Sequence, residues 1–271
     1  MNVGRILEQA QKEELRVEME VFLSALLDTD RLQLLAHPEV EIPVDKLGDL
    51  QIAWTKIKEG VPVAYLINEK EFYGLNFYVD ERVLVPRGET ERLVDYILDR
   101  AHDSARVLEL GTGSGAIAVS LKKTKPKFEL TATDVSKDAL KVATKNCALH
   151  DVDLTLLESD VLEKVPHEDY DVLVANLPYI GVETNNFISE NVKQHEPHTA
   201  LFGGSDGLAL YEKLFKQIND QERAFKLILG EIGFTQGRGI EALARKHLSH
   251  YEFSLCRDYQ DLDRHFILER K

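Results

Sequence analysis

After Ala105 the chain alternates apolar, β-branched stretches with segments of helical periodicity, and this order constrains the fold more than any other feature. Such alternation predicts an α/β fold with a doubly wound, mostly parallel sheet covered by helices. Sheets of this class bind ligands at the carboxyl ends of their strands, so the residues that follow each strand are the first candidates for a site. The predicted strands are 106–110, 128–134, 153–158, 171–175, 224–232, 251–256 and 265–269, and the predicted helices are 116–123, 137–150, 207–219 and 239–248.

The part of the chain before this alternation divides into two regions. Along residues 1–68, apolar residues recur at spacings of three and four, which predicts a small helical bundle. Residues 69–88 are rich in aromatic and β-branched residues and predict a β-hairpin with its turn near Gly74 and Asn76. We therefore expect an N-terminal helical domain (1–68), a hairpin linker (69–88) and a C-terminal α/β domain (89–271). The two apolar stripes of the bundle, which we interpret as packing core, are Leu15, Met19, Phe22 and Leu26, and Leu47, Leu50, Trp54 and Ile57.

The net charge of −14 makes nucleic acid a poor candidate for a partner, because Lys and Arg that neutralise phosphates supply most non-specific affinity. No stretch has the length and apolarity of a membrane span, and the acidic N-terminal segment lacks the apolar core of a secretory signal. The two cysteines, Cys147 and Cys256, cannot make a disulfide framework, which favours a reducing compartment. We expect a cytoplasmic protein that contacts no membrane.

A glycine-rich turn, ELGTGSG, follows the strand at 106–110 and leads directly into a helix. Glycines there let the backbone pass close under a ligand, and the N-terminal amides of the helix can face its polar groups. The spacing of Gly111, Gly113 and Ala116 also fits a dinucleotide fingerprint, so a nicotinamide enzyme remains open at this point. The candidate ligand-binding residues of this turn are Glu109, Gly111, Thr112, Gly113, Ser114 and Gly115.

Acidic residues also follow the next two strands. Asp134 closes the strand at 128–134, where a carboxylate can accept hydrogen bonds from both hydroxyls of a ribose, either of NAD or of S-adenosylmethionine. Asp160 and Val161 follow the third strand, at the position that lies beside an adenine in this topology. A cap of the next helix is the alternative role for Asp134, and a solvated turn is the alternative for Asp160.

The fourth strand ends in Asn176, Leu177, Pro178 and Tyr179, and this set separates the classes of enzyme. The side-chain oxygen of Asn176 and a following backbone carbonyl can accept both hydrogens of a planar NH₂ group, while Tyr179 packs on its face. Holding both N–H bonds aims the nitrogen lone pair at a methyl donor, whereas hydride transfer has no use for the arrangement. The turn therefore predicts methylation of a nitrogen.

With these motifs, the chain resembles the HemK/PrmC family of glutamine-amide methyltransferases that modify class I peptide-chain release factors. The resemblance covers nearly the whole length and rests on five motifs in order: EFYGLNFYVDERVLVPRGET, ELGTGSGAIA, NLPY, HEPHTALFGGSDGL and LGEIGFTQG. It implies a seven-stranded Rossmann-like domain dependent on S-adenosylmethionine, with its last two strands antiparallel, and a helical N-terminal domain that helps to grip the release factor. It also implies methylation of the glutamine in the Gly-Gly-Gln motif, with S-adenosylhomocysteine as the second product, in translation termination.

Carried over by position, the resemblance implies that Gly111 to Gly115 line the donor, Asp134 binds its ribose and Val161 lies by the adenine. Asn176 to Tyr179 would hold the target glutamine, and Asn176 would also border the donor. The family usually has proline where this chain has Leu177 and Gly88. Leu177 still supplies its backbone carbonyl, so these departures predict looser preorganisation and slower turnover rather than an inactive enzyme.

Two other functions remain open from the sequence. Adenine-amine methyltransferases on DNA or RNA use a similar turn, because their target is also a planar NH₂ group, although the acidic charge disfavours them. A weakly active or non-catalytic homologue that binds the donor would follow if Leu177 has cost the chain its activity. A metal site is not expected, because the histidines of His195-Glu196-Pro197-His198 and the pair His247 and His250 lack a clustered third ligand.

Overall fold

The computed structural model describes residues 1–183 and 188–271 and divides the chain into two compact units. The first unit consists of Met1–Glu69 together with Ser189–His195, and the second of Lys70–Ile188 and Glu196–Lys271. The expected range 89–271 for the C-terminal domain does not anticipate that Ser189–His195 belongs to the first unit. No helix among the described residues has the length and apolarity that a membrane span requires.

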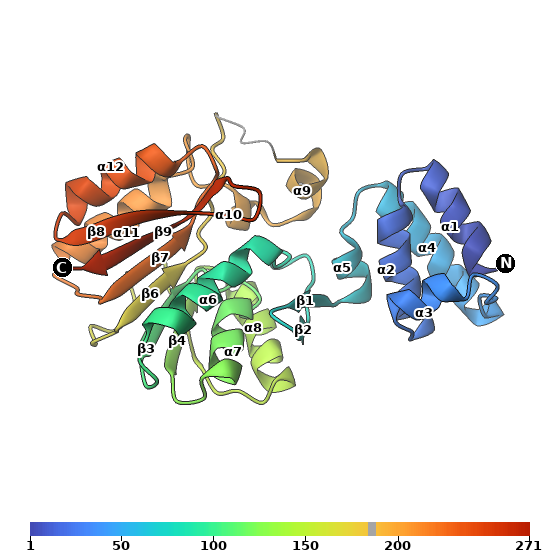
Figure 1. Cartoon of the computed structure of the whole chain (residues 1–271), viewed down its shortest axis with the longest axis horizontal. Helices are drawn as coiled ribbons and strands as arrows, with labels where there is room; N and C mark the ends of the chain where they lie inside the picture. The colour runs from blue at the N-terminus through green and yellow to red at the C-terminus, as the bar shows by residue number, and fades with distance from the viewer. Residues whose placement is uncertain (184–187) are drawn as a thin grey trace. The chain divides into compact units, whose positions relative to one another are not determined.

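The first unit is a bundle of short helices, two of which begin at side-chain caps (Figure 1). Asn2 and Asp30 each accept a hydrogen bond from the backbone N–H three residues later, which satisfies a donor that the helix itself leaves free. The helices are α1 (Val3–Lys12), α2 (Arg16–Leu27), α3 (Arg31–Ala36), the 3₁₀ turn η1 (Val44–Lys46), α4 (Leu47–Lys58), α5 (Val63–Ile67) and α9 (Glu190–His195).

Both predicted apolar stripes lie in the core of this bundle. Met19 and Phe22 of α2 are buried together with Leu50 and Ile57 of α4, and the other four stripe residues are partly buried against the same cluster. The interpretation of the stripes as packing core is therefore confirmed. Helix α9 joins the unit through His195, whose Nε2 lies 2.9 Å from the carbonyl oxygen of Glu59.

The second unit begins with the predicted β-hairpin, formed by β1 (Lys70–Phe72) and β2 (Leu75–Phe77). Its turn consists of Tyr73 and Gly74, which both have positive φ, as a two-residue hairpin turn of the primed type requires. Gly74 thus lies in the turn, and Asn76 lies next to it in β2, where it pairs with Glu71.

The main sheet has seven strands in the order β5-β4-β3-β6-β7-β9-β8. The five strands from β5 to β7 are parallel, and β9 is antiparallel to both of its neighbours, as the resemblance implies. The chain builds outward in opposite directions from β3 and β6, which places a topological switch point between them. The strands are β3 (Arg106–Leu110), β4 (Glu129–Asp134), β5 (Thr155–Glu158), β6 (Val172–Ala175), β7 (Leu227–Glu231), β8 (Tyr251–Arg257) and β9 (Asp263–Arg270).

Each face of the sheet has its own apolar core, because successive side chains of a strand point to opposite faces. Leu108 of β3 belongs to the cluster covered by α11 (Ala209–Asp220) and α12 (Gly237–His247), whereas Val107 belongs to the cluster on the other face. Figure 1 shows α11 and α12 on one side of the strands and α6, α7 and α8 on the other. The remaining helices are the 3₁₀ turn η2 (Gly88–Thr90), α6 (Glu91–Arg100), α7 (Ala116–Thr124), α8 (Lys137–Leu149) and α10 (His198–Leu201).

Candidate active site

A cavity opens at the carboxyl edge of the parallel strands, around the switch point between β3 and β6. The space within and above it amounts to about 1050 Å³, part of which is open solvent. The residues that follow β3, β4, β5 and β6 all reach it. Of the residues singled out from the sequence, the lining includes Glu109, Gly111, Thr112, Gly113, Ser114, Asp134, Asp160, Val161, Asn176, Leu177 and Pro178, but not Gly115 or Tyr179.

The glycine-rich turn forms one wall of the cavity. Gly111, Gly113 and Gly115 have φ values of +69°, +55° and +83°, a region that L side chains rarely adopt. A β-carbon on Gly113 would meet no atom within 4 Å, so there is free space beside the turn. Gly115 instead packs against α8, because a β-carbon there would lie 3.4 Å from that of Ala143.

Asp134 faces the cavity from the end of β4. Its two carboxylate oxygens accept hydrogen bonds from the backbone N–H groups of Gly113, at 2.9 Å, and Ser136, at 2.8 Å. Burial raises the pKa of Asp134, and these backbone donors oppose the rise. A carboxylate can accept about four hydrogen bonds, so Asp134 can still accept hydrogen bonds from the hydroxyl groups of a ligand.

Glu109 lies deeper, with its side chain turned back toward the protein. Its Oε2 accepts hydrogen bonds from Thr112 Oγ1 at 2.8 Å and from the backbone N–H of Ala118 at 3.2 Å. Burial raises the pKa of Glu109 to about 8, although these two hydrogen bonds favour the ionised form. The carboxyl group therefore braces the glycine-rich turn against the start of α7.

Asp160 and Val161 follow β5 at the far end of the cavity. The side chain of Asp160 is paired with Lys213, at 2.8 Å, and is about half exposed. Val161 is buried at φ 53°, and its carbonyl accepts a hydrogen bond from Ser159 Oγ at 3.0 Å. The apolar side chain of Val161 and the polar group of Asp160 thus occur side by side in the lining.

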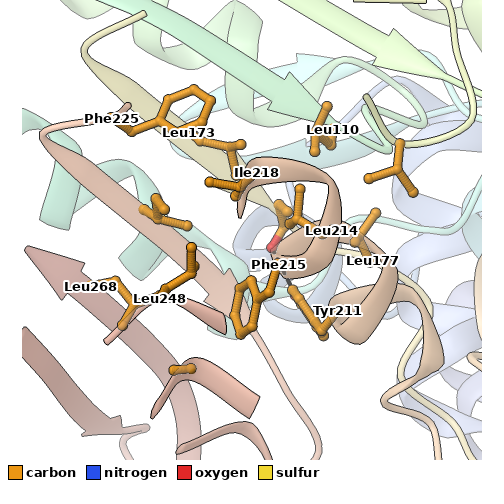
Figure 2. Close-up of a cluster of buried hydrophobic side chains, with 14 of the residues drawn as sticks. Leu110, Leu173, Leu177, Tyr211, Leu214, Phe215, Ile218, Phe225, Leu248 and Leu268 are labelled. Carbon is orange, nitrogen blue, oxygen red and sulfur yellow. Dashed lines mark hydrogen bonds between the residues drawn. The ribbon is translucent and has the colours of Figure 1, made fainter. Parts of the chain in front are cut away.

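The four residues after β6 are Asn176 to Tyr179, and their side chains have different surroundings. Asn176 Nδ2 donates to Thr90 Oγ1 at 3.2 Å. Leu177 is 5% exposed and packs in the core with Tyr211 and Leu214 (Figure 2). Tyr179 is not among the lining residues, and its hydroxyl donates to Glu231 Oε1 at 3.1 Å. Burial and the charge of Glu231 raise the pKa of Tyr179.

The structure adds polar residues that the sequence did not single out. Thr90 donates to Glu231 Oε2 at 2.6 Å, and both side chains are buried. Glu231 could have been found, because it closes the buried strand β7 in the way that Asp134 closes β4. Thr90 carried no such signal, since its partner Glu231 is 141 residues away.

Two arginines also line the cavity. Arg82 pairs with Asp80, and the guanidinium lowers the pKa of that carboxyl to about 2 against the effect of burial. Arg87 pairs with the buried Glu196, which also accepts a hydrogen bond from the backbone N–H of Val85. Glu196 of the HEPH segment thus ties Arg87 and the backbone at Val85 together.

Among residues 1–183 and 188–271, no group of three or more His, Cys, Asp and Glu side chains could hold a metal ion. His198 stacks edge-on against Phe202, with ring centroids 5.4 Å apart, and His195 lies in the first unit.

The groups that line the cavity fit an adenosine-type ligand. Free space beside Gly113, an acceptor at Asp134 and an apolar wall at Val161 occur in the order that a sugar followed by a base would need. The backbone passes close to the carbonyls of Pro178 and Tyr179, because β-carbons on Gly203 and Gly207 would lie only 2.1 and 2.0 Å from those two oxygens.

A seven-stranded α/β sheet with this cavity defines the class of Rossmann-like methyltransferases, and comparisons with known proteins agree. Residues 89–200 match the methyltransferase small domain family, and residues 2–67 match the PrmC N-terminal domain family. A methyltransferase from Pyrococcus furiosus has the same fold, with a TM-score of 0.55 at 18% identity, covering 83% of this chain and 98% of that one. The catalytic domain of hMettl16, solved with the MAT2A 3′UTR hairpin 6, matches with a TM-score of 0.60 at 13% identity, over 78% and 81% of the two chains.

Sequence relatives narrow the class. The release factor glutamine methyltransferase of Lactococcus lactis is 34% identical over 91% of this chain and 92% of its own length. That of Bacillus subtilis is 35% identical over 92% and 90%, and that of Streptococcus pneumoniae is 39% identical over 77% and 75%. The chain belongs to the release factor glutamine methyltransferase family.

Proposed function

We propose that this protein transfers the methyl group of S-adenosylmethionine to the side-chain amide nitrogen of the glutamine in the Gly-Gly-Gln motif of class I release factors. The observation that carries the proposal is the shared cavity of the glycine-rich turn, Asp134 and Asn176. The glycine-rich turn and Asp134 suit an adenosine-type methyl donor, and Asn176 suits a planar NH₂ group that accepts the methyl group. The substrate class follows from the family, whose members are named for it.

S-adenosylmethionine supplies a methyl group on a positively charged sulfur, which departs as the neutral thioether S-adenosylhomocysteine, while the methylated amide nitrogen releases one of its two protons to solvent. In our proposal, Asp134 accepts the ribose hydroxyls, and Asp160 and Val161 border the adenine. Gly111 to Gly115 let the backbone approach the donor closely, with Gly115 acting through its packing on α8.

Asn176 Oδ1 and the carbonyl of Leu177 accept the two hydrogens of the target amide. An amide nitrogen is a weak nucleophile because its lone pair is delocalised, so alignment and exclusion of water must supply much of the rate. Both acceptors follow β6 directly, and the burial of Leu177 fixes the carbonyl that lies between Asn176 and Pro178. The hydrogen bond from the Tyr179 hydroxyl to Glu231 holds the ring in place beside this turn, where its face can pack on the target amide.

The partner is a protein rather than a nucleic acid in this proposal, in keeping with the net charge of −14. The helical first unit helps to grip the release factor. We place the reaction in the cytoplasm, where the translation machinery supplies the substrate.

The test is methyl transfer from labelled donor to three acceptors: a release factor, its Gly-Gly-Ala variant, and DNA. We expect label in the first alone. Label in DNA would establish the adenine-amine alternative, and donor binding without any transfer would establish the non-catalytic one.

Asn176→Ala tests the residue at the centre of the mechanism. The variant loses one of the two hydrogen-bond acceptors for the target amide. We therefore expect the rate of methylation to fall by at least about a hundredfold, while the affinity for S-adenosylmethionine changes by less than about tenfold. Asn219→Ala is the matched control, because Asn219 is exposed on α11. Full activity in Asn176→Ala would refute the assignment.

A further inference from the structure

Glu231 holds both ends of the turn that follows β6. One carboxylate oxygen accepts from Tyr179, at 3.1 Å, and the other accepts from Thr90, at 2.6 Å. Thr90 Oγ1 in turn accepts from Asn176 Nδ2 at 3.2 Å. Glu231 is 2% exposed and Thr90 is 5% exposed, so water does not compete for these bonds as it would at the surface. Asn176, Thr90 and Glu231 therefore form one chain of hydrogen bonds.

The chemistry of the carboxylate sets the direction of this chain. An ionised carboxylate only accepts hydrogen bonds, so the single hydroxyl proton of Thr90 must point to Glu231. The oxygen of Thr90 is then left as an acceptor, and only the NH₂ end of the Asn176 amide can satisfy it. The oxygen and nitrogen ends of an asparagine amide have nearly the same shape, so packing alone would not choose between them.

We propose that Glu231, acting through Thr90, is a positioning residue. It fixes the orientation of the Asn176 side-chain amide, so that Oδ1 is free to accept a hydrogen bond from the side chain that is methylated. This inference rests on the proposed function and deepens it by identifying what selects the substrate side chain. With Oδ1 presented, the site requires an N–H donor, so it accepts the carboxamide of glutamine and rejects the carboxylate of glutamate. A site built around a specific hydrogen bond can discriminate strongly, because the wrong ligand leaves a buried group unpaired.

The charged and polar groups around the carboxylate are consistent with this role. His265 of β9 stands opposite Glu231 of β7 in the sheet, with Nε2 at 3.8 Å from Glu231 Oε2. The hydroxyl oxygen of Tyr211 lies 2.6 Å from the backbone carbonyl of Glu231, to which it donates, and 3.1 Å from that of Ala175, so it lies between the ends of β6 and β7. The carboxylate and the turn that it supports are therefore tied to the same two strands.

Three substitutions separate positioning from mere support of the fold. Thr90→Val keeps the shape of the side chain and removes the hydroxyl, whereas Thr90→Ser keeps the hydroxyl. Glu231→Gln replaces the carboxylate by a group that can present either a donor or an acceptor to Thr90. The matched control is Thr144→Val, because the hydroxyl of Thr144 bonds only to the carbonyl of Leu140 within α8 in the described contacts.

The primary readout is binding of two full-length release factors, one with Gly-Gly-Gln and one with Gly-Gly-Glu, to the intact protein with S-adenosylhomocysteine present. We expect the wild type to prefer the glutamine form, and Thr90→Val and Glu231→Gln to lose at least about tenfold of that preference. Thr90→Ser should keep it within about threefold, and donor affinity should stay within about threefold in every variant. Melting temperatures show that each variant is folded.

Retention of the preference in Thr90→Val would overturn the proposal, and so would an equal loss in Thr144→Val or the lack of any preference in the wild type. Methyl transfer is measured in parallel, where turnover of Thr90→Val should fall with the preference. Wild-type protein that binds the glutamine form selectively but transfers no methyl group would refute the proposed function alone, because the binding comparison decides the role of Glu231 without turnover.

Discussion

Leu177 lies against Gly111, with its Cδ2 atom 3.3 Å from the position that a β-carbon on Gly111 would occupy. The carbonyl oxygen of Asn176 is 3.6 Å from the same position. A side chain at position 111 would therefore press the turn proposed for the methyl donor against the turn proposed for the amide acceptor.

Gly111→Ala tests this contact. The new methyl group would press on Leu177, and φ of +69° strains any L residue, so we expect a loss of about 1–3 kcal/mol in the free energy of unfolding. Donor affinity and turnover should fall together, because both turns move. Gly48→Ala is the control for a general effect of alanine: Gly48 lies in α4 with no atom within 4 Å of an added β-carbon, so stability should rise by about 0.5–1 kcal/mol. Urea denaturation and donor titration measure both quantities, and an unchanged Gly111→Ala variant would contradict the contact.

Leu177→Pro tests whether the absence of proline at this position lowers the turnover rate. The leucine side chain is buried with Tyr211 and Leu214, which restrains the turn by packing where a proline would restrain it by its ring. Loss of that packing costs about 1–3 kcal/mol, whereas the ring contributes no more than about 1 kcal/mol. We therefore expect lower stability and no gain in turnover. Leu177→Ala, which lacks both restraints, should be the slower of the two variants. Faster turnover of Leu177→Pro would show that Leu177 does attenuate the enzyme.

Gly88→Pro should stabilise the protein. Gly88 begins the 3₁₀ turn η2, and an added β-carbon would meet no atom within 4 Å. The preceding residue, Arg87, has φ −105° and ψ 145°, the extended conformation that a residue before proline prefers. We expect the free energy of unfolding to rise by about 0.4–1 kcal/mol, seen as a higher melting temperature. Gly74→Pro is the opposite control, because φ of +70° is closed to proline and the variant should be destabilised.

Asp171 makes stability depend on pH in the acid range. Burial raises its pKa, but Lys226 at 2.7 Å, the backbone N–H of Arg106 and His102 outweigh that effect and lower the pKa to about 2. The folded state thus binds the proton more weakly than the unfolded chain, so the stabilisation is complete above about pH 4 and disappears as the pH falls through about 2.

Asp171→Asn should therefore cost about 1–2 kcal/mol at pH 7, and the difference from the wild type should vanish near pH 2. Denaturant titrations at several pH values measure the difference. Asp169→Asn, at an exposed neighbouring position, should leave stability unchanged within about 0.5 kcal/mol. A cost for Asp171→Asn that stays constant with pH would argue for packing rather than charge.

Most of the sheet could be predicted from the sequence, because parallel strands buried on both faces appear as continuous apolar runs. All four residues of β6 are buried, and β3 has only Arg106 incompletely buried. The turns after these strands were equally visible, since Gly111 and Asn176 stand where the apolar runs stop. The antiparallel direction of β9 came from the family resemblance and not from its composition.

Long-range pairing accounts for what the sequence did not show. No periodicity connects Thr90 with Glu231, and none connects Glu231 with the hydroxyl of Tyr179. His195 of the first unit likewise contacts Glu59, 136 residues away. Local patterns predict elements, whereas these partners are chosen only when the elements pack.

The membership of Ser189–His195 in the first unit also means that these two units are not interchangeable modules. The chain passes from one to the other three times, after Glu69, after Ile188 and after His195. A fragment that begins at Lys70 would retain α9 and lose the Glu59 carbonyl beside it. Grafting the helical unit onto a different methyltransferase would therefore require two insertion points, because α9 would have to be transferred together with residues 1–69.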